Sequence, residues 1–189
     1  MHTPFSLTGY RVGLRPICVD DVDAIMEWIN DPAVTRNFAN MSRTITRSQE
    51  RDFLDGMIAS DTDRLYAIVG SDGTHIGNAG IHKIYWPARN GRLGLVVGHT
   101  DAQGQGLGQE ALRLLITLGF EQLGLHKLWM VHYRTNDRMR HIAIKHGFQR
   151  EGLLRDEYFH AGTFHDMERH GLLEHEYRDL RGSWVTTGS

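Results

Sequence analysis

The sequence is almost without cysteine, carries little net charge and has no long hydrophobic run. Its single cysteine, Cys18, excludes an internal disulfide and favours a reducing, cytoplasmic location. No run approaches the roughly 18 apolar residues that a membrane-spanning helix needs, and residues 1–15 lack the apolar segment of a secretion signal. The formal net charge of -2 gives no electrostatic reason to expect binding to nucleic acid or to an anionic membrane. We therefore expect a soluble protein, and 189 residues predict one domain, 1–189, with a core over about 8–178.

Three glycines alternate in one short loop, Gln103-Gly104-Gln105-Gly106-Leu107-Gly108. A strand-like run, 93–98, precedes this loop and a helix-like run, 109–123, follows it. Free N–H groups and the positive end of a helix dipole then meet at one point, which predicts a site for a phosphate or pyrophosphate. A glycine-rich turn without a ligand is the alternative.

The hydrophobic pattern predicts a mixture of strands and helices along the whole chain. We expect strands over 8–14, 65–69, 75–85, 93–98 and 127–133, with a closing hairpin of 148–158 and 163–173 around Ala161-Gly162. Helices are expected from Asp20-Asp21 to about Ile29, and over 46–60, 109–123 and 136–146, whereas 174–189 is polar and predicted to be partly disordered after about Gly182. This order predicts an α+β fold, with a single mixed β-sheet flanked by helices on both faces.

The position of the loop excludes two common nucleotide-binding motifs. A Rossmann fingerprint that starts at Gly104 needs glycine at its sixth position, which is Gln109, and it belongs near the start of a βαβ unit. A Walker loop needs Gly-Lys-Ser/Thr, which is absent.

The loop and the helix start Gln109-Glu110-Ala111-Leu112 resemble the acetyl-CoA loop of the GNAT family of N-acetyltransferases. Asn136, followed by a helix and Gly147-Phe148, is similar to that family's second cofactor element. Further motifs resemble the branch typified by ribosomal-protein N-terminal acetyltransferases, namely Leu14-Arg15-Pro16, Trp28-x-Asn30-Asp31-Pro32-x-Val34, Glu151-Gly152, Arg155, Gly162, Asp166 and Leu172-Leu173. The resemblance covers roughly residues 10–178.

The resemblance implies that acetyl-CoA is the co-substrate and that its pantetheine arm enters beside a splayed strand. The backbone of Val96, Val97 and Gly98 is then expected to bind the arm, with the oxyanion donor an N–H near Val97 or Gly98. The pyrophosphate is expected on the N–H groups of Gln103, Gly104, Gln105, Gly106, Leu107 and Gly108. Asn136 is expected to contact the cofactor near its reactive end, although such a residue can also be a plain helix cap.

The resemblance implies acetyl transfer to a primary amine and favours a protein N-terminal α-amine. Amino sugars, aminoglycosides and polyamines are alternatives, as is a non-catalytic acyl-CoA-binding module. An α-amine of pKa near 8 costs only about 1–1.5 kcal/mol to deprotonate at pH 7, whereas a lysine-like amine costs roughly 4–5 kcal/mol. An enzyme that acts on peptide N-termini therefore needs a weaker general base than one that acts on lysine-like amines.

The catalytic groups are not evident from the motifs. Many family members place a tyrosine acid at the position of Ala143, so Tyr158 is our candidate acid, although it can equally be a packed strand residue. Glu157 and His165, beside Asp166, are the candidate bases on the closing hairpin; a solvated charge and a structural hydrogen bond are the alternatives.

Twelve histidines are many for this length. Four recur every five residues (His160, His165, His170 and His175), and neither a strand nor a helix brings that spacing onto one face. We therefore expect no metal site. Edge strands in the closing hairpin make a homodimer possible.

Overall fold

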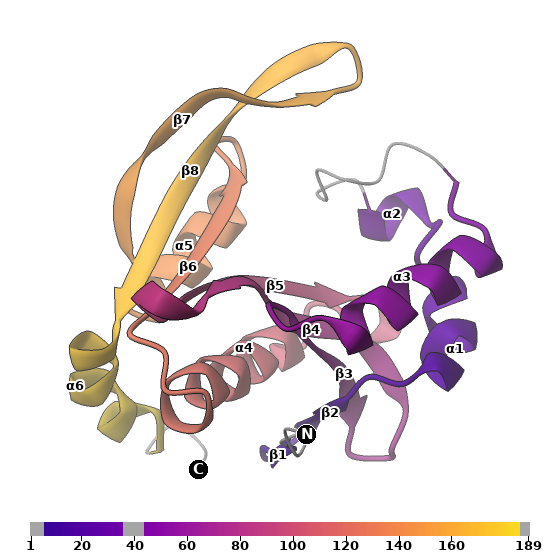
Figure 1. Cartoon of the computed structure of the whole chain (residues 1–189), viewed down its shortest axis with the longest axis horizontal. Coiled ribbons are helices and arrows are strands. Elements are labelled where there is room, and N and C mark those ends of the chain that lie inside the picture. The colour runs from indigo at the N-terminus through magenta and orange to yellow at the C-terminus, as the bar shows by residue number, and fades with distance from the viewer. Residues whose placement is uncertain (1–5, 36–43, 186–189) are drawn as a thin grey trace.

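A computed structural model describes residues 6–35 and 44–185, and it contains one eight-stranded mixed sheet (Figure 1). The strand order is β1-β2-β3-β4-β5-β6-β8-β7, and every neighbouring pair is antiparallel except β5 and β6. The strands are β1 (Leu7–Thr8), β2 (Val12–Pro16), β3 (Arg64–Gly70), β4 (His75–Tyr85), β5 (Asn90–Val97), β6 (Lys127–Tyr133), β7 (Gln149–His160) and β8 (Thr163–Leu173).

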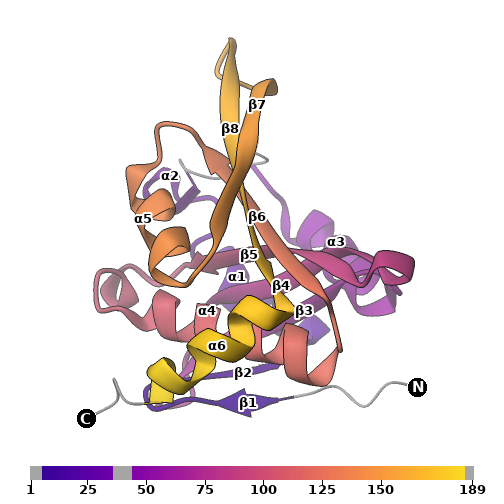
Figure 2. The ribbon, with the colours of Figure 1, turned by 90° about the vertical axis from the view of Figure 1, so that its left-hand side faces the viewer.

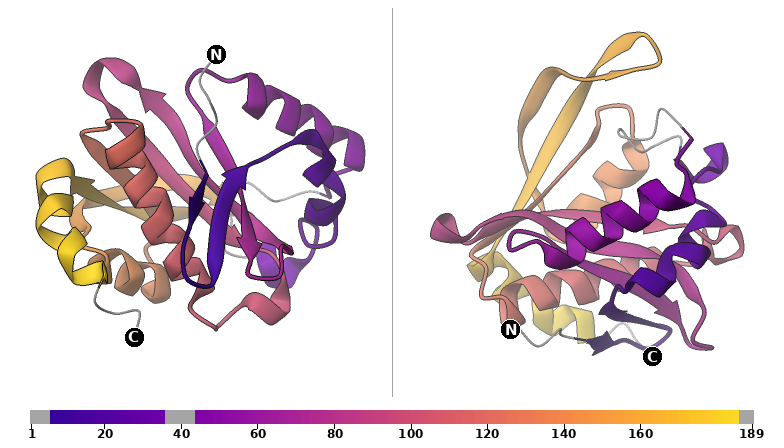
Figure 3. Two further views of the ribbon diagram at one scale, coloured as in Figure 1. Left: turned by 90° about the horizontal axis from the view of Figure 1, so that it is seen from below. Right: turned by 45° about the vertical axis from the view of Figure 1, so that its right-hand side comes forward.

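Helices cover both faces of the sheet, which confirms the predicted fold class (Figures 1 and 3). The helices are α1 (Val22–Met26), α2 (Pro32–Thr35), α3 (Arg47–Ala59), α4 (Leu107–Thr117), α5 (Asp137–Lys145) and α6 (Glu174–Val185), with a π-helical turn at Leu118–Gln122. The larger core joins α4, α5 and α6 to the sheet, and a smaller core joins α1 and α3 to the opposite face. The sheet therefore separates two layers, each with its own apolar contacts.

Local signals in the sequence account for the start of α3 and the end of α5. Thr46 and Gln49 form a capping box at the start of α3, since the Thr46 hydroxyl accepts from the Gln49 N–H at 3.3 Å and the Gln49 side chain accepts from the Thr46 N–H at 3.0 Å. Gly147 ends α5 at φ +83°, a conformation that glycine adopts without strain. Both signals lie within about four residues of the helix end that they determine, so the sequence alone is enough to predict them.

The parallel strands β5 and β6 pair only at one end. Their register covers Asn90 to Arg92 of β5 against Lys127 to Trp129 of β6. Beyond these residues β5 pairs with β4 as far as Val97, and β6 pairs with β8 as far as Tyr133. The sheet therefore opens between its two halves, at the edge of β5 that faces away from β4.

The hairpin of β7 and β8 projects well beyond the rest of the sheet, as the side view in Figure 2 shows. Its register shifts between Leu154 and Tyr158, where Asp156 has φ +51°. The hairpin was predicted correctly, and its β7 edge is the last in the strand order.

Two regions differ from the sequence prediction. The helix predicted to run from Asp20-Asp21 to Ile29 is a 3₁₀ turn followed by five residues of α1, because the chain turns to bury Trp28 and Ile29 under the sheet. The tail 174–189, predicted to be polar and partly disordered after about Gly182, forms α6 as far as Val185, and residues 186–189 lie outside the described residues. A few apolar side chains dock this helix, above all Tyr177, whose ring is 3% exposed and stacks on Phe120 at 4.9 Å.

No helix within residues 6–35 and 44–185 combines the length and the hydropathy needed to cross a bilayer.

Tyr177 provides a test of how firmly α6 holds to the core. Its hydroxyl donates to Glu121 at 2.7 Å, and burial first, with the Glu121 charge, raises its pKa to about 12. Tyr177→Ala removes a buried ring and is expected to lower the free energy of unfolding by about 3–5 kcal/mol. Tyr177→Phe keeps the ring and should cost only about 1 kcal/mol. Urea unfolding followed by circular dichroism measures both, and an alanine variant no less stable than the phenylalanine variant would contradict this packing.

Candidate active site

The glycine loop has the backbone conformation of an anion site. Gly104 and Gly106 have φ of +78° and +82°, and Gly106 is the residue on which α4 begins. Within the described chain, the N–H groups of residues 104–108 have no backbone acceptor, whereas the N–H of Gln103 donates to Thr100 O at 3.0 Å. The structure therefore leaves five consecutive N–H donors of the predicted six, and the Gln103 side chain donates to the carbonyl of Val97.

Arg11 ties this loop to the start of the sheet. Its guanidinium donates to the carbonyl of Gln105 at 2.9 Å and to the carboxylate of Glu110 at 3.2 Å. Glu110 also accepts from the backbone N–H groups of Arg11 and Val12, at 2.7 and 3.3 Å. Burial alone would raise the pKa of Glu110, but these hydrogen bonds hold it below its usual value. The loop is thus braced from outside, which keeps its N–H groups free for a ligand.

Of the three strand residues predicted to bind the pantetheine arm, Val97 has its backbone on the open side. The N–H of Gly98 donates to Ile76 O at 2.9 Å, so it points toward β4. Because backbone groups alternate along a strand, the N–H and C=O of Val97 point into the gap and those of Val96 point toward its partner Asn78. The Val97 carbonyl accepts from the Gln103 side chain at 3.0 Å, which leaves its N–H toward the gap. The N–H of Gly98 is already engaged, which makes Val97 the better oxyanion donor.

A cavity of about 200 Å³ lies on the face of the sheet that α1 and α3 cover. Its wall is mainly apolar and is formed by Trp28, Ile29, Thr35, Glu50, Phe53, Leu65, Asn78, Ala79, Gly80, His82, Arg92, Gly94, Leu95 and Val96. Glu50 is the one carboxylate among these described residues, and it is 3% exposed. Burial raises the pKa of Glu50, because an apolar wall disfavours the charged form. Arg92 lies in the same wall, but burial alone shifts the pKa of Glu50, so this carboxylate is available to a cationic ligand that brings its own apolar body.

His82 lines the same cavity and is paired with Asp63. The His82 Nδ1 lies 3.1 Å from Asp63 Oδ1, and the two side chains are 15% and 17% exposed. Glu50 and His82 were not found from the sequence. The available signal for Glu50 is its helical spacing of four residues from Leu54, which puts an acid on the buried face of α3. No comparable local signal marks His82.

The three residues predicted to be catalytic lie on the projecting hairpin, outside the lining of this cavity. Glu157 is exposed, while the rings of Tyr158 and His165 meet Tyr133 edge-on with centroids 6.2 and 5.3 Å away. His165 Nε2 also lies 3.2 Å from the carbonyl of His160, the structural bond that the sequence left open. The structure thus groups Tyr158 and His165 and turns Glu157 outward, and their catalytic roles stay predictions.

Asn136 is the N-cap of α5, since its Oδ1 accepts from the Met139 N–H at 3.1 Å. This is the helix-cap alternative, and it leaves the amide nitrogen free of that bond. Ala143, farther along α5, is fully buried in the core. That position therefore supplies no acid for a departing thiolate.

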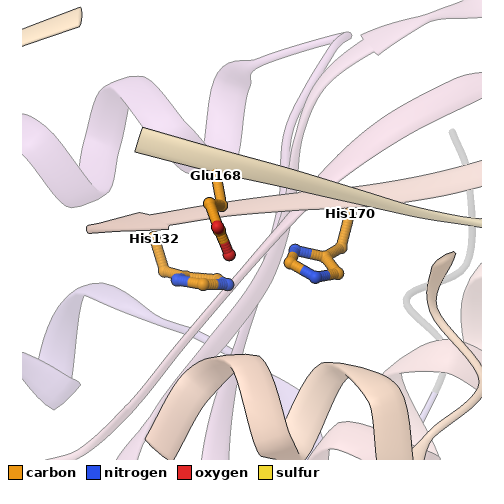
Figure 4. A group of neighbouring side chains, drawn as sticks. All are labelled: His132, Glu168 and His170. Atoms are coloured by element: carbon orange, nitrogen blue, oxygen red, sulfur yellow. The ribbon is translucent and has the colours of Figure 1, made fainter. Parts of the chain in front are cut away.

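Three buried side chains, His132, Glu168 and His170, converge under the sheet with ligand atoms within 4.8 Å of one another (Figure 4). Only His170 belongs to the five-residue histidine series; His132 comes from β6, which the sequence pattern could not foresee. The Glu168 oxygens already accept from Arg140 Nε at 2.8 Å and face Arg150 Nε at 3.3 Å. These two fixed positive charges oppose a metal cation, so the absence of a metal site stays a prediction.

Comparisons with known proteins agree with this geometry. The sequence profile of the "Acetyltransferase (GNAT) domain" matches residues 11–149. Spermidine N(1)-acetyltransferase of Escherichia coli (strain K12) is 27% identical over 158 residues, which is 83% of this chain and 83% of that protein. "Uncharacterized N-acetyltransferase p20" of Bacillus licheniformis is 29% identical over 150 residues, which is 77% of this chain and 83% of that protein.

The fold has equally clear counterparts among solved structures. Spermidine N-acetyltransferase from Vibrio cholerae, solved with CoA and spermine, superposes with a TM-score of 0.82 at 20% identity, over 88% of this chain and 98% of that one. These relatives do not support the narrower resemblance to the ribosomal-protein branch. The profile match extends over most of the chain and includes the glycine loop. This chain therefore belongs to the GNAT acetyltransferase family and is an acetyl-CoA-dependent N-acetyltransferase.

Proposed function

We propose that this enzyme acetylates a small primary amine that enters as an ammonium ion and binds against Glu50. The observation that carries the proposal is the buried carboxylate in the cavity beside β5. A charged carboxylate in an apolar wall is costly unless a partner of opposite charge arrives. An ammonium group supplies that partner, and the apolar wall accommodates the carbon chain next to it.

The donor side of the reaction follows from the loop and the gap. The N–H groups of residues 104–108 would hold the pyrophosphate of acetyl-CoA, and the N–H of Val97 would donate to the oxygen of the thioester as it becomes an oxyanion. Val96, the next residue on the same strand, lines the cavity of Glu50. A short stretch of β5 would therefore bring the acetyl group and the amine together.

The class of amine is inferred from two observations that point in different directions. The name of the E. coli relative supports a polyamine. The one carboxylate among the described lining residues matches a single ammonium, which also suits the α-amine of a protein N-terminus, the second candidate. We favour the small amine because the cavity has a volume of only about 200 Å³ between the sheet, α3, Thr35 of α2 and the turn at Trp28 and Ile29.

A panel of acceptors tests this function directly. Purified protein with acetyl-CoA is expected to release free thiol with polyamines or small monoamines, and more slowly with peptide N-termini. Faster release with peptides would favour the N-terminal acetyltransferase. Binding of acetyl-CoA by calorimetry without thiol release from any amine would support the non-catalytic module and contradict the proposal.

The cofactor loop is tested by Gly106→Val. Valine at φ +82° is strained, and its side chain crowds the N–H groups that would bind the pyrophosphate. We expect the Kd for acetyl-CoA to rise about a hundredfold, the loss of one or two charge-assisted hydrogen bonds, with the fold retained. Gly124→Val is the matched control, because Gly124 also has positive φ, at +63°, and lies outside the loop. Equal affinity in a folded Gly106 variant, measured by calorimetry, would exclude the loop as the cofactor site.

The acceptor site is tested by Glu50→Gln, which keeps the shape and removes the charge. We expect KM for the amine to rise about 10- to 100-fold, since a charge-assisted hydrogen bond contributes about 1.5–3 kcal/mol, with the Kd for acetyl-CoA unchanged. Because burial raises the pKa of Glu50, KM in the native enzyme should also rise as pH falls through that pKa, where the carboxylate becomes neutral. Asp55→Asn, an exposed acid on the same helix, is the control. An unchanged KM in the Glu50 variant would place the ammonium elsewhere.

A further inference from the structure

The carboxylate of Asp63 is held by donors on both of its oxygens. Oδ2 accepts from the Ser60 hydroxyl at 2.7 Å and from the Thr62 hydroxyl at 3.1 Å. Oδ1 accepts from the N–H of Lys83 at 3.2 Å and lies 3.1 Å from Nδ1 of His82. Burial would raise the pKa of Asp63, but these hydrogen bonds outweigh it and hold the pKa below its ordinary value. Asp63 is thus an ionised, immobile acceptor for the imidazole.

The backbone beside His82 is distorted in a way that serves this contact. Lys83 has φ +52°, which is unfavourable for a residue with a side chain, and the register of β4 with β5 shifts between His82 and Tyr85. The distortion directs the Lys83 N–H to the same Asp63 oxygen that holds the imidazole. Strain of this kind is retained where the surroundings fix a particular side-chain position.

The imidazole lies over a pair of glycines that face each other across two strands. Gly80 of β4 is directly opposite Gly94 of β5, and a Cβ built on them would lie 2.6 and 3.3 Å from His82 Nε2. All three residues line the cavity that contains Glu50. Because Nδ1 is turned to Asp63, the second ring nitrogen lies on the cavity side, above the strand that leads to Val97.

The charges that face His82 come from four directions. Asp63 precedes β3, Lys83 follows on β4, Arg92 is opposite on β5, and Glu50 of α3 lines the same cavity. Burial lowers the pKa of His82, Arg92 lowers it further, and Asp63 only partly opposes them. His82 is therefore neutral near pH 7, with its proton on Nδ1 toward Asp63 and a lone pair on Nε2.

We propose that His82 is the general base of acetyl transfer and that Asp63 is its positioning residue. The inference rests on the proposed function, since it places the acceptor ammonium in the same cavity. Gly94 and Val97 are three residues apart on β5, or roughly 10 Å, so a bridging water carries the proton between the amine and Nε2.

The step balances without a further reactant. The ammonium R–NH₃⁺ gives one proton through the water to His82 Nε2, and the resulting amine attacks the thioester carbon. The tetrahedral intermediate breaks its C–S bond, and the second amine proton goes to the departing thiolate. The products are the acetamide, CoA as its thiol, and an imidazolium that returns its proton to solvent.

A ring that covers two glycines can also be simple packing, so the test uses two replacements. His82→Gln keeps polarity without a base, whereas His82→Phe keeps a ring over Gly80 and Gly94. We expect both to lower kcat by about 100-fold or more and to abolish the acid limb of the kcat profile, which in the native enzyme falls as pH drops through the lowered pKa of His82. Asp63→Asn, which removes the positioning charge, is expected to lower kcat by about 10- to 100-fold.

His75→Gln is the matched control, because His75 is also on β4 with its Nδ1 beside an acid, 3.3 Å from Asp21, but does not line the cavity. It should leave kcat and the pH profile unchanged, and all variants should keep the native Kd for acetyl-CoA. A phenylalanine variant with native kcat and an intact acid limb would overturn the proposal while leaving the acetyltransferase function in place. A native enzyme that acetylates no amine of the panel would overturn the proposed function and the base together.

Discussion

Beyond Arg92 of β5 and Trp129 of β6, the two parallel strands no longer pair. A strand edge that loses its neighbour inside a sheet leaves backbone donors and acceptors that another molecule must satisfy. In this protein the unpaired edge ends at Val97 and is followed at once by the glycine loop and the start of α4. The opening of the sheet therefore places an extended groove and an anion site in one line, which is the arrangement that a long thioester cofactor needs.

The core has two layers, one on each face of the sheet. Helices α4, α5 and α6 pack on one face, and α1 and α3 pack on the other. The cofactor loop belongs to the first layer and the cavity of Glu50 to the second. Strand β5 leads to the loop and also lines the cavity, through residues whose side chains and backbone groups alternate along it. In the proposed function this strand brings donor and acceptor together.

The parts of the fold that could be predicted are those with a local cause. The capping box at Thr46, the turn at Gly73 and the helix end at Gly147 lie within a few residues of the structure they determine. α6 was missed because its sequence is polar and its stability comes from contacts such as Tyr177 on Phe120, which are distant along the chain. The helix before Asn30 was predicted to be too long for a similar reason, since the burial of Trp28 against Gly98 requires the chain to turn.

The sequence alone determined the family and the acetyl donor, and it predicted the loop for the donor's pyrophosphate, because glycines at fixed spacing between a strand and a helix carry their own backbone geometry. It did not determine the acceptor side. The catalytic roles of Glu157, Tyr158 and His165 on their hairpin stay predictions. The acceptor cavity that we propose joins Glu50 of α3 to His82 of β4, with Asp63 behind it. Those three lie on separate elements and meet only when the sheet and α3 pack together. Tertiary structure decides this half of the site, because a charge is perturbed by what surrounds it in space and not by its neighbours in sequence.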